Sequence, residues 1–94
     1  MRKDVIYNSN YKDVLLSNIG MIHTTDLGEM RIKRNLKINN LDVVSHIIDI
    51  IKNNNTIIYK KGKNYYCKMD NIIITINSYN YCIITVHVEK SSIK

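Results

Sequence analysis

The spacing of hydrophobic and polar residues changes once along this chain, near residue 56. Before that point, apolar residues recur every three or four positions, which is the period of an amphipathic helix. After it, apolar and polar residues alternate in short runs rich in Ile, Val, Thr and Tyr, as in half-buried strands. The pattern predicts an α+β domain in which three helices pack on one face of a four-stranded antiparallel β-meander.

Turn residues divide the second part of the chain into four strands. We expect strands over residues 56–60, 64–69, 72–77 and 81–88. Gly62 permits the positive φ of a tight turn, and Asp70 with Asn71 also tolerates the left-handed region. A polar loop at residues 78–80 precedes the last strand. Connections this short join neighbouring antiparallel strands, which predicts a meander.

Three helices are expected over residues 10–55. The first begins near Asn10 and ends at Gly20, and the second runs from Thr25 or Asp26 to about Leu36. The third runs from about residue 41 to 53 and is capped by Asn39 or Asn40. In the second helix, the residues expected to face inward are Leu27, Met30 and either Ile32 or Leu36. The third has a wide apolar stripe and should cover the sheet: Val43, Val44, Ile47, Ile48, Ile50 and Ile51.

The chain length predicts one domain with a single core. Residues 1–9 form a loosely ordered arm or a short edge strand, and residues 89–94 form a frayed tail. No apolar run is long enough for a signal peptide or a membrane span, so we expect a cytoplasmic protein without a membrane partner. Cys67 and Cys82 fall on strands two and four of the meander, which is too far apart for a disulfide.

A formal charge of +6, from 14 basic and 8 acidic residues, favours RNA or another polyanion as partner. The same charge also promotes solubility. Two groups of cations stand out. The second helix presents Arg31, Lys33, Arg34 and Lys37, of which the first three are candidate RNA contacts, and the first hairpin carries Lys60, Lys61, Lys63 and Lys68, of which the last three are candidates. Basic residues near a helix end also complement its dipole, and lysines on a hairpin also prevent aggregation. Both explanations stay open.

Alternation along the strands places a mixed set of side chains on the face away from the helices. Tyrosines stack on bases and cations hold phosphates, so this face is suited to RNA, although a solvated sheet face has a similar composition. The set comprises Tyr66, Lys68, Thr75, Asn77, Tyr81, Thr85 and His87, with Lys60 as a further candidate.

Catalytic motifs are sparse. The histidines and cysteines lack metal-ligand spacing, and no glycine-rich phosphate loop is present, so we expect no metal and no cofactor. His87 is the one histidine positioned to act as a general acid or base. With Tyr66, Tyr81 and either Arg31 or Arg34, it could assist attack by an RNA 2′-hydroxyl on the neighbouring phosphate.

Four segments resemble a small bacterial family catalogued as domain of unknown function 3781. They are IHTTDLGEMRIKRNL (22–36), KGKNYY (61–66), IITIN (73–77) and IITVH (83–87), and the resemblance covers most of the chain from residue 15 to 87. It implies membership but no activity. More distantly, the layout of helices followed by a basic meander resembles the RelE and BrnT superfamily of small toxins, which are ribonucleases neutralised by an antitoxin. No catalytic residue of those toxins can be carried over to a position here.

Three functions are compatible with these features. The first is a small basic RNA-binding domain of toxin-like type. In one version of this hypothesis, the domain also cleaves RNA as a metal-independent endoribonuclease. The second is a protein-interaction or inhibitor module, such as a phage-linked anti-defence protein, that docks through a strand edge or its basic face. Its partner would be an antitoxin or a component of a defence system. The third is a small-nucleotide binder that uses Arg31, Arg34 and the tyrosines.

Overall fold

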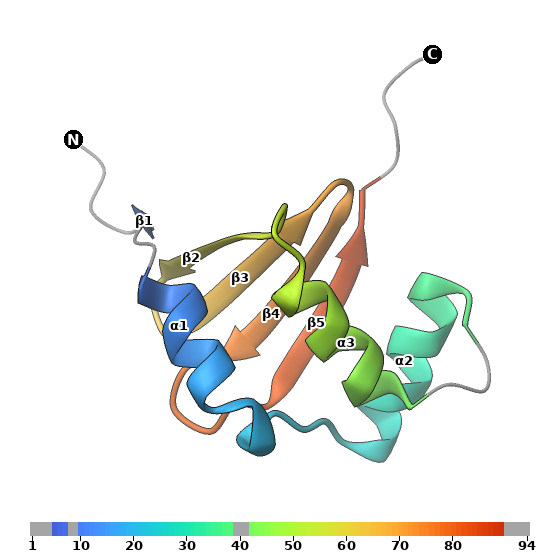
Figure 1. Ribbon diagram of the computed structural model, residues 1–94. Helices are drawn as coiled ribbons and strands as arrows, with labels where there is room; N and C mark the ends of the chain where they lie inside the picture. Colours follow the sequence, from blue (N-terminus) through green and yellow to red (C-terminus); the bar gives the residue numbers. More distant parts are fainter. Residues whose placement is uncertain (1–4, 8–9, 39–41, 90–94) are drawn as a thin grey trace, which may run out of the picture.

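The computed structural model describes residues 5–7, 10–38 and 42–89. An antiparallel sheet forms one layer, and the helices lie on one side of it and beside its last strand (Figure 1). This arrangement confirms the predicted α+β fold. In chain order the elements are β1 Val5–Tyr7, α1 Asn10–Ser17, the short 3₁₀ helix η1 Ile19–Met21, α2 Asp26–Leu36, α3 Val43–Lys52, β2 Ile57–Lys61, β3 Asn64–Met69, β4 Ile72–Asn77 and β5 Ile83–Val88.

The strands follow one another across the sheet in the order β1-β2-β3-β4-β5, and every pair is antiparallel. The predicted four-stranded meander is therefore present as β2–β5. β1 extends it at the β2 edge, where Val5 lies opposite Lys61 and Tyr7 opposite Tyr59. For residues 5–7, the edge strand is thus the correct alternative. The rest of the predicted arm, and the tail from residue 90, lie outside the described residues.

The first two hairpin turns have the predicted chemistry. Gly62 has φ of +61° and Asp70 has φ of +54°, and both lie in the left-handed region that tight turns require. The third loop differs, because Tyr81 adopts φ of +61° and β5 begins only at Ile83, two residues later than expected. The Asn77 side chain supports this loop by accepting hydrogen bonds from the backbone N–H groups of residues 79 and 80, at 2.8 and 3.0 Å.

A shift of register between β4 and β5 reverses part of the predicted alternation. Thr85 lies opposite Thr75 but Ile83 lies opposite Ile76, so Ile84 is the additional residue of a bulge. As a result, Ile83 is 2% exposed in the core and Ile84 is 50% exposed. The sequence pattern predicted the opposite for these two residues. It failed because simple alternation assumes an uninterrupted ladder.

The core lies between the sheet and the helices. The buried stripe of α3 consists of Val43, Ile47, Ile50 and Ile51, which belong to the predicted apolar face of this helix. The side chains that are least exposed come from α1, α2, α3, β3, β4 and β5: Leu15, Ile32, Ile47, Ile51, Cys67, Ile74, Ile76 and Val86. Burying each large aliphatic side chain contributes about 1.5–3 kcal/mol, so this cluster supplies the main driving force for folding.

The starts of α2 and α3 are fixed by side-chain caps. Thr25 accepts a hydrogen bond from the Gly28 N–H at 3.0 Å, as one of the two predicted starts requires. At α3, the cap is Asp42, which accepts from the Ser45 N–H at 3.2 Å. The expected caps at residues 39 and 40 lie outside the described residues. Because Asp42 is the cap, α3 begins at Val43, about two residues later than predicted, and the Asp42 carboxylate satisfies one N–H of its first turn.

Only part of α2 faces the core as predicted. Ile32 is 2% exposed and Leu36 packs against the core, but Leu27 and Met30 are 55% and 60% exposed. The prediction that Leu27 and Met30 turn inward is therefore wrong. α2 lies beside β5, and this position covers one side of the helix only (Figure 1).

The outer edge of β5 is occupied by the segments that precede it in the chain. His23 forms an isolated parallel bridge with Cys82: its N–H donates to the Tyr81 carbonyl at 3.2 Å, and its carbonyl accepts from the Ile83 N–H at 2.8 Å. Further along, the Asn35 amide donates to the Val86 carbonyl at 2.8 Å. These contacts satisfy backbone groups that an uncovered edge strand would expose.

The hydrogen bond of Thr56, just before β2, to the end of α3 can be tested by mutation. Its side chain is buried, and its hydroxyl donates to the Ile50 carbonyl near the end of α3, at 2.5 Å. Thr56→Val keeps the shape but removes this donor, so the free energy of unfolding should fall by about 1 kcal/mol in urea denaturation. The matched control is Thr85→Val on the exposed face, for which we expect a change within about 0.5 kcal/mol. Equal losses in the two variants would contradict this assignment.

Candidate nucleic-acid interface

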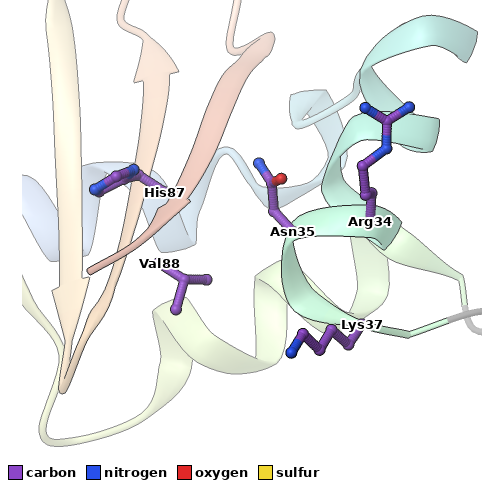
Figure 2. A pocket seen from close by; sticks show the side chains of 5 residues that line it. All are labelled: Arg34, Asn35, Lys37, His87 and Val88. Carbon is purple, nitrogen blue, oxygen red and sulfur yellow. The ribbon is translucent and has the colours of Figure 1, made fainter. Parts of the chain in front are cut away.

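A pocket of about 360 Å³ opens between the C-terminal end of α2 and the end of β5 (Figure 2). The five residues that line it are Arg34, Asn35, Lys37, His87 and Val88. Three of them carry a basic group and one carries an amide, and none of the lining residues that the structure describes carries a carboxylate. Such a lining is suited to an anion, because guanidinium and ammonium groups donate hydrogen bonds to phosphate oxygens.

The way α2 ends brings Lys37 to the pocket. Lys37 has φ of +59°, and its N–H donates to the Lys33 carbonyl, which also accepts from the Ile38 N–H at 3.0 Å. This left-handed residue stops the helix and turns the chain. In Figure 2, the Lys37 side chain extends from the end of the helix in the direction of Val88.

The Asn35 side chain fixes the distance between the two walls of the pocket. Its hydrogen bond to the Val86 carbonyl joins α2 to β5 one residue before His87. The bond is partly shielded from water, which makes breaking it more costly than breaking an exposed one. The cations of α2 are therefore held beside the strand without having to contact it themselves.

The two ends of the pocket open in different directions. In Figure 2, the His87 ring and the Arg34 guanidinium extend away from each other, with Asn35 between them. Both side chains belong to exposed residues. An extended polyanion could contact both at once, whereas a single small anion could not be enclosed by them.

The open face of the sheet continues from His87 towards β2. The strand register places Ile57, Lys68, Ile73 and His87 in one row across β2–β5, and Tyr59, Tyr66, Thr75 and Thr85 in the next. The Tyr59 and Tyr66 rings stack with a centroid separation of 5.3 Å and an interplanar angle of 12°. A pair of stacked rings thus lies next to the row that contains Lys68 and His87.

The structure does not bring the three predicted catalytic residues together. Tyr66 and His87 share the open face, but β4 separates them, so their backbones are roughly 10 Å apart or more. Tyr81 precedes β5, packs against the core and lies at the opposite end of this strand from His87. An acid–base set built from all three would therefore need a substrate that spans the sheet.

The predicted helix cations differ in whether they are paired. Lys33 forms an ion pair with Glu29 at 3.3 Å, as the i, i+4 spacing allows. Arg31 and Arg34 are exposed and form no ion pair with any residue that the structure describes. Their positive charge is therefore available to a partner.

The cations of the sheet fall into three different places. Lys68 lies on the open face and approaches Glu89 at 4.0 Å. Lys61 and Lys63 flank the β2–β3 turn. His87 pairs with Ile73 near the β3–β4 turn, so it lies at the opposite end of the sheet from these two lysines. Lys60 was expected on the open face, but its amine lies 6.0 Å from the centre of the Tyr65 ring, on the helix side. Strand β2 ends at Lys61, one residue later than predicted. Its register pairs Lys60 with the buried Tyr65, so the Lys60 side chain lies on the helix side of the sheet.

Three residues of the pocket were not among the predicted site residues: Asn35, Lys37 and Val88. The basic charge of Lys37 was visible in the sequence, but a left-handed helix end without glycine gives a weak signal. The role of Asn35 depends on which strand α2 lies beside. Neither role could be read from periodicity.

Burial changes the acidity of two groups on β3. It raises the pKa of the Cys67 thiol to about 12, with a smaller opposing effect from Lys12. It also raises the pKa of Tyr65, to which the charges of Tyr81 and Tyr11 contribute. Both cysteines are free thiols. In the described ranges, no three His, Cys, Asp or Glu side chains gather in a way that could hold a metal ion.

The fold and the pocket together define a small α+β domain with a basic site where a helix meets a strand. The model of the family described as "Protein of unknown function (DUF3781)" matches residues 16–87, so the chain belongs to this family. No curated protein and no solved structure matches the chain, and the resemblance in layout to the RelE and BrnT toxins stays a prediction. Among the described helices, none has the length and apolar character needed to cross a membrane.

The cysteines should differ strongly in reactivity. With a thiol reagent at pH 8, the partly exposed Cys82 should react quickly, whereas the buried Cys67 should react only when the protein unfolds. Native protein should therefore show one fast thiol and denatured protein two, and Cys82→Ser should abolish the fast phase. Two fast thiols in the native state would contradict the burial of Cys67.

The raised pKa of Cys67 also predicts a dependence of stability on pH. Above about pH 9 the unfolded chain loses the thiol proton, while the folded chain keeps it until about pH 12. The contribution of the Cys67 thiol to the free energy of unfolding is therefore fully present below pH 9 and is lost as the pH rises towards 12. Cys67→Val should reduce the decline measured by denaturation between pH 8 and 11. The pKa of Tyr65 is also raised, so the share of the stability decline that Tyr65 causes should persist in this variant.

Proposed function

We propose that this protein binds single-stranded RNA, whose backbone phosphates contact the cations that line the pocket between α2 and β5. The observation that carries the proposal is that Arg34, Lys37 and His87 line one pocket, with no acidic side chain among the described residues around it. Phosphate oxygens accept hydrogen bonds from guanidinium and ammonium groups, and binding releases counterions from the RNA. The family description assigns no function that would favour another ligand.

The surface on both sides of the pocket supports an extended ligand. Arg31 lies one helical turn before Arg34 on α2 and is also unpaired among the described residues. On the other side, His87 leads to the row of the open face that contains Lys68, and Tyr66 lies two residues before Lys68 on β3. Phosphates would contact the cations, and a base would stack on Tyr66.

We propose binding without cleavage as the principal activity. The hypothesis of a metal-independent endoribonuclease required His87, Tyr66 and Tyr81 to act on one phosphate, and Tyr81 lies at the far end of β5. A small-nucleotide binder is also less well supported, because the described lining of the pocket offers no Tyr, Phe or Trp ring on which a base could stack. We place this binding in the cytosol, where RNA is present and both thiols would stay reduced.

Two charge reversals of equal size test where RNA binds. Arg34→Glu/Lys37→Glu alters the pocket, and Lys61→Glu/Lys63→Glu makes the same change of charge at the opposite end of the sheet. Fluorescence anisotropy with a labelled RNA of mixed sequence, about 12 nucleotides long, should show at least a ~10-fold weaker affinity for the first variant and less than a ~3-fold change for the second. The wild-type affinity should fall as salt is raised.

Several results would contradict the proposal. Equal losses in the two variants would mean that net charge alone attracts RNA, and no binding at low salt would refute the proposal outright. The same reactions, run on a gel with end-labelled RNA, test cleavage. Intact RNA is expected, and cleavage that falls more than about tenfold in His87→Ala would instead support the ribonuclease hypothesis.

A further inference from the structure

One face of α2 is used neither by the core nor by the contact with β5. Leu27, Met30, Arg31 and Arg34 recur at spacings of three and four, so they lie together on one side of the helix. We call these four residues the outer face of α2. All four are exposed.

The other sides of α2 already have partners. Ile32 and Leu36 contact the core, and Asn35 binds the backbone of β5. Glu29 and Lys33 form an ion pair with each other. In the described part of the chain, the outer face is therefore the side of α2 without a partner.

The apolar residues of this face call for an explanation other than RNA. Leu27 and Met30 are 55% and 60% exposed and lie one turn apart, and neither lines the basic pocket. Phosphates and sugars gain little from contact with aliphatic side chains, whereas an opposing protein helix would bury them, with about 25 cal/mol per Å² of apolar surface removed from water. Methionine adapts its shape to a partner, which favours its use at docking surfaces.

The charges of the face select the partner. Arg31 follows Leu27 by four residues and Arg34 follows Met30 by four, so each apolar residue has a guanidinium beside it. We propose that the outer face of α2 docks an acidic amphipathic helix of a partner protein. Leucine-type residues of that helix would contact Leu27 and Met30, and its carboxylates would pair with Arg31 and Arg34.

The outer edge of β5 also favours docking of a helix over addition of a strand. The β5 edge is occupied by the bridge of His23 to Cys82 and by the Asn35 hydrogen bond, so a partner could not add a strand at these positions. Leu27 and Met30 lie outside the pocket, whereas Arg34 lines it and Arg31 lies beside it on the surface proposed for RNA. Docking therefore does not depend on the proposed RNA binding, but a docked helix should compete with RNA for Arg34.

The probe for this proposal is a synthetic 16-residue peptide designed as a helix with leucines at i, i+3, i+4 and i+7 and glutamates beside them. The wild-type protein should bind this peptide, and Leu27→Gln/Met30→Gln should weaken binding at least ~10-fold with RNA affinity unchanged. Glutamine maintains helix propensity. The matched control is Ile57→Thr, which removes an equally exposed apolar residue, 59% exposed, from the open face and should leave peptide binding unchanged.

An exchange of charges distinguishes docking from general attraction. Arg31→Glu should lose the acidic peptide and gain affinity for a peptide in which lysines replace the glutamates. Loss of RNA binding instead of peptide binding in Leu27→Gln/Met30→Gln would assign the outer face to RNA. A dimer in sedimentation that disappears in this variant would assign it to a second copy of the chain. Either result, or no binding of the peptide by the wild type, would overturn the proposal.

Discussion

The outer edge of strand β5 determines where the remaining parts of this protein lie. An edge strand presents backbone donors and acceptors that need partners. Here His23, which lies between η1 and α2, and Asn35 of α2 supply hydrogen bonds to three of these groups. Because α2 is used to cover an edge, it lies beside the sheet and buries only the side that carries Ile32. Its C-terminal end then faces the end of β5, which forms the basic pocket, and its outer face stays exposed.

The remaining helices serve the core. α3 buries a wide stripe of isoleucines and valine against the sheet, and α1 contributes Leu15. This division leaves the opposite face of the sheet open, so that Tyr66, Lys68 and His87 are available there. The two proposed surfaces are consequences of the same arrangement, and they share Arg31 and Arg34. A partner helix on α2 would therefore be expected to regulate access of RNA to the pocket.

Charge by itself would have suggested one diffuse basic protein. The structure separates the cations by their surroundings: Lys33 is neutralised by Glu29, Lys68 approaches Glu89, and Lys60 packs over the Tyr65 ring. Arg31, Arg34 and Lys37 remain without ion pairs in the described residues, and they follow one another along the second half of α2 and its end. Pairing and position, more than the total of +6, decide where a polyanion would be held.

Local pattern by itself determined the helices, the meander and the first two turns, because hydrophobic period and turn chemistry are properties of neighbouring residues. Gly62 and Asp70 adopt the positive φ that their positions required. The local pattern also predicted most of the buried stripe of α3 and that both cysteines are free thiols. Only the tertiary structure decided the bulge that exchanges Ile83 and Ile84, the exposure of Leu27 and Met30, and the pocket that joins Arg34 to His87. Each of these depends on which distant segment lies alongside, and the periodicity of one segment carries no information about its neighbour.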